Sequence, residues 1–213
     1  MTVPLIDRYR DRLPVSAATP VISLGEGSTP LLRAPRLGEL LGVELWLKWE
    51  ASNPTGSYKD RGMTVAVSKA VEEGAEAVIC ASTGNTAASA AAYAARAGIP
   101  ALVLVPQGQV AGPKVAQTRM LGARVLEVEG DFDEALDAAR ELGRRGTHAL
   151  VNSLNPYRRQ GQKTAVLEIV EELGATPDAF VIPYGGGGNT SAYAQALGEQ
   201  GLEARIVSVE AEH

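Results

Sequence analysis

The chain has 213 residues, of which 45% are hydrophobic, so it is long and apolar enough to bury a sizeable core. Its formal net charge is −5 and its basic residues are scattered among acidic ones, which argues against nucleic-acid and membrane partners. Charges near the N-terminus and the lack of an apolar run of about 18 residues predict neither a signal peptide nor a membrane span. The single cysteine, Cys80, argues against a disulfide framework and predicts a cytoplasmic protein.

Apolar segments of strand length alternate with segments of helical pattern along most of the chain. The predicted strands are residues 44–50, 77–81, 101–105, 124–128, 149–151, 180–183 and 205–209. The predicted helices are residues 59–73, 85–97, 113–121, 132–145, 157–173 and 190–198. This alternation indicates an α/β fold, with open, mainly parallel sheets that helices cover on both faces. Ligands of such sheets bind outside the carboxyl ends of the strands, so the loops that follow the strands are the candidate sites.

One lysine, Lys59, follows a Pro/Gly turn and stands at the start of a predicted helix. Partial desolvation and the positive end of the helix dipole both favour its neutral amine, which can attack an aldehyde to give a Schiff base. Most lysines are solvated surface groups, so a catalytic role for Lys59 needs support from elsewhere in the chain.

Two further loops have the composition of anion sites. Hydroxyl and amide side chains follow the strand 77–81 at the start of a helix, a setting that suits a carboxylate; they are Ser82, Thr83, Asn85 and Thr86. The strand 180–183 is followed by Gly185, Gly186, Gly187, Gly188 and Asn189. Four glycines let backbone N–H groups wrap closely around a phosphate, although a plain flexible turn is the alternative.

A third loop, after the strand 149–151, carries Asn152, Ser153, Arg158 and Arg159. Two arginines beside amide and hydroxyl groups could clamp a second anion, and a solvated helix start explains the same residues equally well.

A dinucleotide site is the competing interpretation of the glycine run. Gly185 and Gly187 could be the first two glycines of GxGxxG, with Glu210 as the ribose ligand, but Thr190 stands where the third glycine is required. The sequence also lacks a GxxxxGK[ST] loop and a Cys/His cluster for zinc. A lysine, a phosphate loop and a carboxylate loop together describe pyridoxal phosphate more economically than a nucleotide.

The same residues carry a resemblance to a known family. The segments that carry it are residues 25–30, 53–63, 81–86, 151–158 and 183–189. As a set they resemble threonine synthases, in the tryptophan-synthase-β-like (fold type II) group of pyridoxal-phosphate-dependent enzymes. The resemblance covers nearly the whole chain. Tyr58 stands where the family usually has phenylalanine, and Gly186 and Gly187 replace the usual asparagine and alanine, as in the related dehydratases.

The resemblance implies a role for each candidate residue. Lys59 would form the Schiff base with pyridoxal 5'-phosphate, Asn85 would contact the cofactor's ring hydroxyl, and residues 185–189 would hold its phosphate. Ser82, Thr83, Asn85 and Thr86 would bind the substrate carboxylate. Lys114, Asn152, Ser153 and Arg158 would bind the phosphate that leaves the substrate.

The implied reaction converts O-phospho-L-homoserine and water to L-threonine and phosphate, in threonine biosynthesis. A threonine or serine dehydratase-like lyase and a noncatalytic scaffold of the same fold are the alternatives. The resemblance also implies a smaller domain, residues 51–150, inserted in a larger one, residues 1–50 plus 151–213. Relatives would continue for roughly a hundred residues more, so we expect a C-terminally truncated chain, with an incomplete larger domain, that associates as a homodimer.

Overall fold

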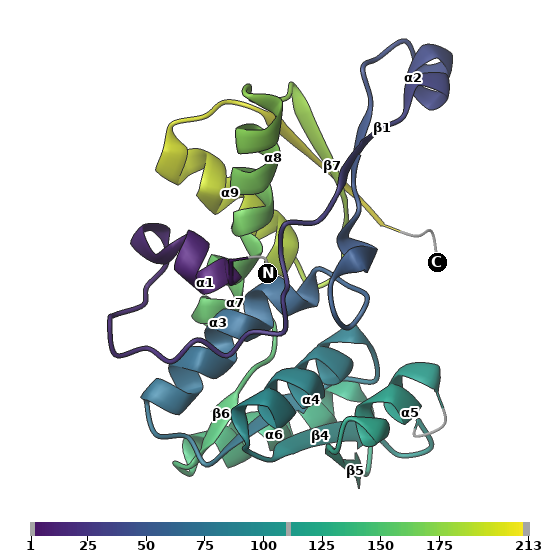
Figure 1. The fold of residues 1–213 in the computed structure, drawn as a ribbon. Helices are drawn as coiled ribbons and strands as arrows, with labels where there is room; N and C mark the ends of the chain where they lie inside the picture. Colours follow the sequence, from purple (N-terminus) through teal and green to yellow (C-terminus); the bar gives the residue numbers. More distant parts are fainter. Residues whose placement is uncertain (1–2, 110–111, 211–213) are drawn as a thin grey trace.

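The computed structural model describes residues 3–109 and 112–210. Its helices are α1 (Leu5–Arg8), α2 (Pro35–Leu41), α3 (Lys59–Glu72), α4 (Asn85–Ala97), α5 (Pro113–Met120), α6 (Phe132–Arg144), α7 (Pro156–Gln162), α8 (Thr164–Leu173) and α9 (Gly188–Gln200). Its strands are β1 (Leu31–Arg33), β2 (Trp46–Lys48), β3 (Ala77–Ala81), β4 (Ala101–Pro106), β5 (Arg124–Val128), β6 (His148–Leu150), β7 (Ala179–Pro183) and β8 (Arg205–Val209). The predicted α/β class is confirmed, and Figure 1 shows the arrangement.

The four-stranded sheet β5-β4-β3-β6 is parallel throughout and forms the lower part of the view in Figure 1. Every residue of β3 is buried, and successive side chains point to opposite faces. Val78 and Cys80 pack with the alanine-rich helix α4, whereas Ile79 and Ala81 pack with α6. Helices therefore cover both faces of this sheet, as its continuous apolar strands predict.

The second parallel sheet consists of β7 and β8 and is buried on one face. Phe180 and Ile182 pack against α8 and α9, and the ring of Phe180 meets the ring of Tyr193 edge to face at 5.5 Å. The alternate residue Val181 is 66% exposed, and Val207 on the neighbouring strand is exposed as well. Within the described residues, helices therefore cover only one face of this pair.

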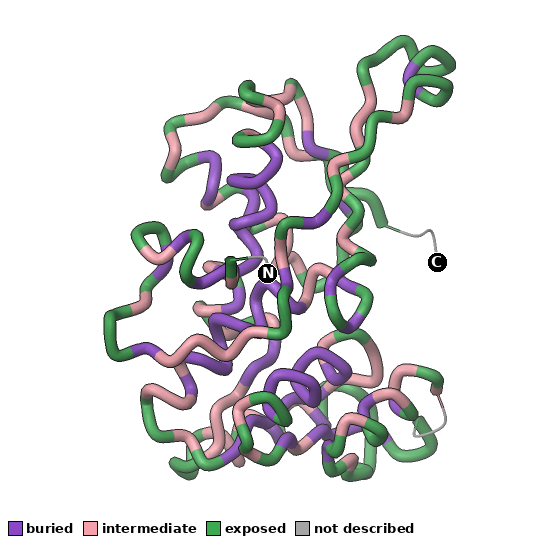
Figure 2. The backbone as a smooth tube through the Cα atoms, in the orientation of Figure 1, coloured by how far each residue is buried: buried purple, intermediate pink, exposed green. Residues whose placement is uncertain are grey.

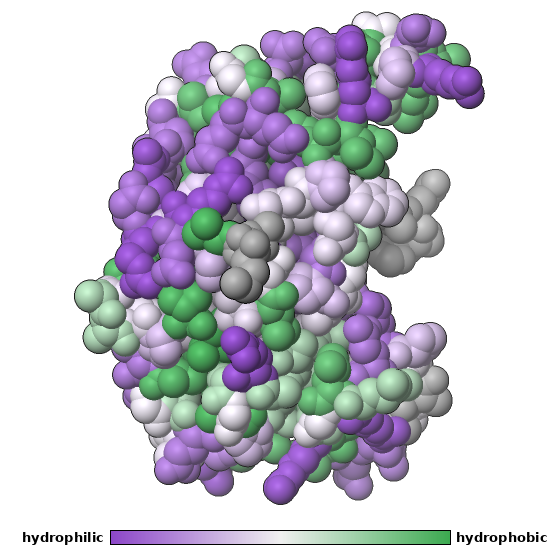
Figure 3. Space-filling view, in the orientation of Figure 1, coloured by the Kyte–Doolittle hydropathy of each residue, from purple (hydrophilic) through white to green (hydrophobic). Residues whose placement is uncertain are grey.

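The antiparallel pair β1 and β2 carries α2 at its tip and projects from the rest of the chain. Exposed leucines gather on this projection, Leu40 most of all. Figure 2 shows the projection mostly exposed, in contrast with the largely buried α3 and α4. Figure 3 shows the surface hollowed between the projection and the region of α5.

The predicted helix 157–173 is wrong as a single element, because it is two helices that meet at Lys163. The Thr164 hydroxyl donates to the Gly161 carbonyl at 2.6 Å, at the junction. Gly161 also lies directly on α3: a Cβ built on it would stand 1.9 Å from the Arg61 carbonyl oxygen. Lys163 itself keeps helical backbone angles, φ −59° and ψ −23°, so the junction is a local interruption that helical periodicity cannot show.

Other predicted boundaries need smaller corrections. The predicted strand 44–50 is only Trp46–Lys48, and the helix predicted at 190–198 begins earlier, at Gly188. The division into domains 1–50 plus 151–213 and 51–150 stays a prediction, and its terminal residues 1–2 and 211–213 lie outside the described residues. No helix within the described ranges is both long and apolar enough to cross a membrane.

Candidate active site

A cavity of about 260 Å³ lies where the carboxyl ends of the strands meet the start of α3. Its wall consists of Tyr58, Lys59, Ala81, Ser82, Thr86, Phe132, Asn152, Ser153, Gln162, Pro183, Gly185, Gly186, Gly187, Gly188, Asn189 and Thr190. Ala81 ends β3 and Pro183 ends β7, so both parallel sheets contribute their carboxyl edges. This is the place where the topology predicts a ligand.

Lys59 is the first residue of α3, as the sequence predicts, and a buried carboxylate holds the turn that precedes it. Asp60 accepts hydrogen bonds from the Thr55 backbone N–H at 2.7 Å and from the Thr55 hydroxyl at 2.6 Å. It also accepts one from the Ser89 hydroxyl on α4 at 2.6 Å. These three bonds tie the Pro/Gly turn to α4 and hold Lys59 at the cavity.

The amine of Lys59 lies in an environment that favours its neutral form. Burial, followed by the positive charge of Arg158, lowers the pKa of Lys59 to about 8. Its Nζ donates a hydrogen bond of 2.8 Å to the Tyr58 hydroxyl, and this bond acts against that shift because it is stronger for the ammonium than for the neutral amine. Burial raises the pKa of the Tyr58 hydroxyl itself. About a tenth of the amine is therefore neutral at pH 7, far more than for a solvated lysine, and the neutral amine is the form that attacks an aldehyde.

The glycine loop turns directly into α9. Gly187 caps this helix with a left-handed φ of 73°, which residues with a side chain rarely adopt. The N–H groups of the first helical turn, from Gly188 to Thr190, have no acceptor within the helix. A Cβ built on Gly185 would meet nothing within 4 Å, so the loop leaves open space beside these donors. An anion such as a phosphate fits this arrangement.

Arg158 lies behind the cavity wall and not in it. Its side chain is fully buried, and Nη1 donates to the Val151 carbonyl at 3.1 Å. Within the described residues Nε and Nη2 have no hydrogen-bond partner, and burial lowers the pKa of the guanidinium. Asn152, by contrast, exchanges two hydrogen bonds with the backbone of Ala81, at 3.0 and 2.9 Å, and so extends the pairing of β3.

The structure brings most of the sequence-predicted residues to the cavity. Those in its wall are Lys59, Ser82, Thr86, Asn152, Ser153, Gly185, Gly186, Gly187, Gly188 and Asn189. Thr83, Asn85, Lys114 and Arg158 are not in the wall; Asn85 is exposed, and Lys114 donates to the Thr55 carbonyl and the Gln117 side chain, at 3.4 and 3.2 Å.

Sequence reasoning missed several residues of the wall. Gln162 is buried, and its Oε1 lacks a partner within the described residues. It stands four residues after Arg158 on α7, a helical spacing that could have indicated it. Phe132 follows β5 at the same sheet edge, so the strand-end rule could have found it. The sequence marks Tyr58 only as a departure from the family pattern.

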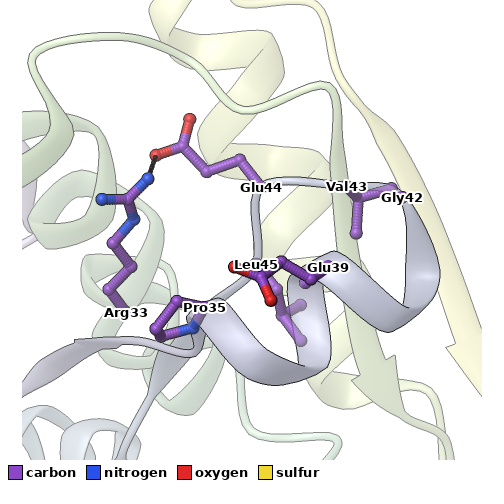
Figure 4. A pocket seen from close by; sticks show the side chains of 8 residues that line it. Arg33, Pro35, Glu39, Gly42, Val43, Glu44 and Leu45 are labelled. Carbon is purple, nitrogen blue, oxygen red and sulfur yellow. Dashed lines mark ion pairs between the residues drawn. The ribbon is translucent and has the colours of Figure 1, made fainter.

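Larger hollows of 380 and 460 Å³ lie elsewhere and have different linings. The first, shown in Figure 4, is formed by the α2 projection alone, with an ion pair of 3.5 Å between Arg33 and Glu44 at its edge. The second lies between α1 and the helices α8 and α9. Neither has a nucleophile or a glycine-rich helix start, so chemistry, not volume, identifies the site. Within the described residues no group of three or more potential metal ligands occurs.

The chain matches the profile of one protein family, described as "Pyridoxal-phosphate dependent enzyme", over residues 22–213. The chain belongs to this family. Threonine synthases are among its similar relatives: that of Halalkalibacterium halodurans is 52% identical over 89% of this chain and 53% of the relative. The threonine synthase of Methanocaldococcus jannaschii is 50% identical over 87% of this chain and 46% of the relative. The chain thus spans about half the length of these relatives.

Solved structures of related enzymes have the same fold. Maize serine racemase superposes with a TM-score of 0.80 and 26% identity, over 96% of this chain and 60% of that one. The processed form of threonine deaminase isoform 2 from Solanum lycopersicum superposes with a TM-score of 0.74 and 31% identity, over 85% of this chain and 50% of that one. Pyridoxal 5'-phosphate is the cofactor of this family, and the cavity fits it, because a lysine with a lowered pKa and a row of free helix N–H groups line the same hollow.

Proposed function

We propose that the chain carries the active site of a threonine synthase, which converts O-phospho-L-homoserine and water to L-threonine and phosphate. The observation that carries the proposal is the cavity, which joins Lys59 to the glycine loop at the start of α9. The threonine synthases at 50–54% identity support the choice of reaction.

When bound, pyridoxal phosphate supplies an electron-accepting ring and an aldehyde. Lys59 would hold the cofactor through its amine, and as a free amine it would hold and move protons at the α and β carbons of the substrate. The N–H groups of residues 188–190 and the side chain of Asn189 would bind the cofactor phosphate. Asn85 would contact the cofactor's ring hydroxyl, and residues 82, 83, 85 and 86 would bind the substrate carboxylate.

The leaving phosphate needs a second set of donors and positive charges. We assign this role to Asn152, Ser153, Arg158 and Lys114. Ser153 lies in the wall, and the two unpartnered nitrogens of Arg158 are spare donors behind it, among the residues that the structure describes. Lys114, at the start of α5, Asn85, at the start of α4, and Thr83 lie outside the wall, so their roles require these segments to approach the bound ligand more closely.

A dehydratase-like lyase is the second candidate. The four successive glycines of residues 185–188 and the similarity in fold to a threonine deaminase favour it. Such an enzyme removes a β hydroxyl and needs no second phosphate site, so the residues of that site distinguish the two reactions.

We further propose that the chain acts in the cytoplasm as a homodimer, with domains as divided in the sequence. Its one cysteine, buried and free, supports a reducing compartment, and the exposed valines of β7 and β8 support association. Sedimentation of the pure chain as a clean monomer at micromolar concentration would contradict the dimer.

The test is reduction of the cofactor-loaded chain with borohydride, followed by peptide mass spectrometry. We expect the adduct on Lys59, its loss in Lys59→Ala, and its retention in the control Lys69→Ala, because Lys69 pairs with Glu72 away from the cavity. Phosphate release from O-phospho-L-homoserine supports the synthase, whereas 2-oxo acid release from L-threonine alone favours the lyase. Absence of any adduct would overturn both and leave a noncatalytic scaffold.

A further inference from the structure

Tyr58 and Lys59 are adjacent in sequence and face each other in the cavity. Tyr58 precedes the first turn of α3 with helical backbone angles, φ −59° and ψ −11°, and both side chains are half-buried in the wall. The Lys59 Nζ donates to the Tyr58 hydroxyl at 2.8 Å and stands 4.5 Å from the centroid of its ring. Among the described residues, this hydroxyl is the hydrogen-bond acceptor of the Lys59 amine.

The other charged or titratable groups near this pair either repel an ammonium or are already hydrogen-bonded to other residues or buried in their neutral form. Arg158, on α7, is fully buried and repels a second positive charge. The carboxylate of Asp60 is taken by Thr55 and Ser89, and the thiol of Cys80 on β3 is buried with a raised pKa. The glycine loop and Phe132 bring no charge to the cavity. The Tyr58 oxygen is thus, within the described part of the chain, the group that compensates an ammonium here.

We propose that Tyr58 is a positioning residue for Lys59: its hydroxyl holds the amine in the cavity and stabilises the protonated form of that amine. A hydroxyl acceptor binds an ammonium more strongly than a neutral amine, because the bond to the ammonium is charge-assisted. The Tyr58 hydroxyl therefore acts against burial and Arg158, which lower the pKa of Lys59. It keeps a proton on the Lys59 amine available for transfer. The inference rests on the proposed function of Lys59 for its catalytic meaning, but the contact itself does not.

The test measures the basicity of Lys59 without cofactor. The chain is labelled with a trace of acetic anhydride between pH 6 and pH 10, and mass spectrometry gives the rate at each lysine. In Tyr58→Phe we expect the midpoint for Lys59 to fall by about one pH unit, with about tenfold faster labelling below it. Tyr58→Gln restores an acceptor, and we expect a midpoint between those of the wild type and Tyr58→Phe.

The matched control is Tyr9→Phe, which removes a hydroxyl that donates to Glu171 away from the cavity, and which should leave the Lys59 midpoint unchanged. The labelling profile of Lys69 in the same samples reports whether each variant is folded. An unchanged Lys59 midpoint in folded Tyr58→Phe overturns the proposal. A further variant, Tyr58→Leu, removes the ring as well as the hydroxyl. If only Tyr58→Leu shifts the midpoint, the ring and not the hydroxyl holds the amine, and the proposal is again overturned. A chain that binds no cofactor still gives these profiles, so failure of the proposed function is detected separately by borohydride.

Discussion

Two regions of the molecule each contain a fully buried arginine, and they differ in how completely the guanidinium is bonded. Arg61, on α3, donates to Glu50, Glu168, Thr29 and Thr164, at distances of 2.7 to 3.2 Å. Arg158, on α7, donates once, to a backbone carbonyl, and leaves Nε and Nη2 without partners in the described part of the chain.

The charges around the two arginines differ in the same way. Burial lowers the pKa of Arg61, but the hydrogen bonds and charges of Glu168 and Glu50 outweigh burial and raise it overall. For Arg158 burial prevails and the pKa is lowered. A buried arginine whose donors are all hydrogen-bonded, such as Arg61, stabilises the fold. One that has unpartnered donors beside a cavity, such as Arg158, is a candidate for binding an anion.

The largest effect on stability is expected at Arg61. Arg61→Leu leaves the carboxylates of Glu168 and Glu50 without their main partner, which should lower the free energy of unfolding by about 3–5 kcal/mol in urea titrations. The control is Arg33→Leu, which breaks an ion pair with Glu44 that is 62% exposed at the arginine, and should cost less than about 1 kcal/mol. Equal losses in the two variants would contradict the comparison.

Acidification is expected to lower the free energy of unfolding somewhat less than Arg61→Leu does. Although burial alone raises it, the pKa of Glu168 falls from 4.5 to about 2, mainly because Arg61 donates to its carboxylate. Between these values the unfolded chain binds a proton that the folded chain does not. The resulting stability, about 3 kcal/mol, is present above pH 4.5 and is lost as pH falls toward 2.

Urea unfolding at pH 5 and pH 2.5 measures this loss. Glu168→Gln, which cannot titrate, should be less stable at pH 5 but should lose less stability on acidification. If the two chains lose equal stability between these pH values, Glu168 is not responsible for the acid sensitivity.

The smallest effect on stability is expected at Arg158. Arg158→Met removes a buried charge that has few partners among the described residues, so the free energy of unfolding should change by less than about 1 kcal/mol or should increase. Turnover of O-phospho-L-homoserine should nevertheless fall roughly 100-fold or more, with little change in cofactor attachment. The neighbouring exposed Arg159→Met should leave both unchanged, and an equal loss of cofactor in Arg158→Met would contradict a role in binding the leaving phosphate.

Local sequence patterns predicted most of the elements after residue 45 and the loops that line the cavity, but they did not predict α1, β1 or α2. The apolar run 77–81 and the alanine-rich segment 85–97 became β3 and α4 with the predicted bounds, because burial on both faces leaves a continuous apolar pattern. The glycines of residues 185–188 and the turn before Lys59 were recognisable because their backbone requirements are local. Parallel-sheet topology then placed these loops at one edge.

Only the tertiary structure decided which of these residues meet. Arg61 and Glu168 stand 107 positions apart, and nothing local in either segment distinguishes this buried pair from two solvated charges. The close backbone contact between Gly161 and Arg61, and the place of Gln162 in the wall, both depend on how α7 packs against α3. Sequence periodicity indicates which face of a helix is apolar. The segment that packs against this face is distant in the sequence, so the contact is determined only when the chain folds.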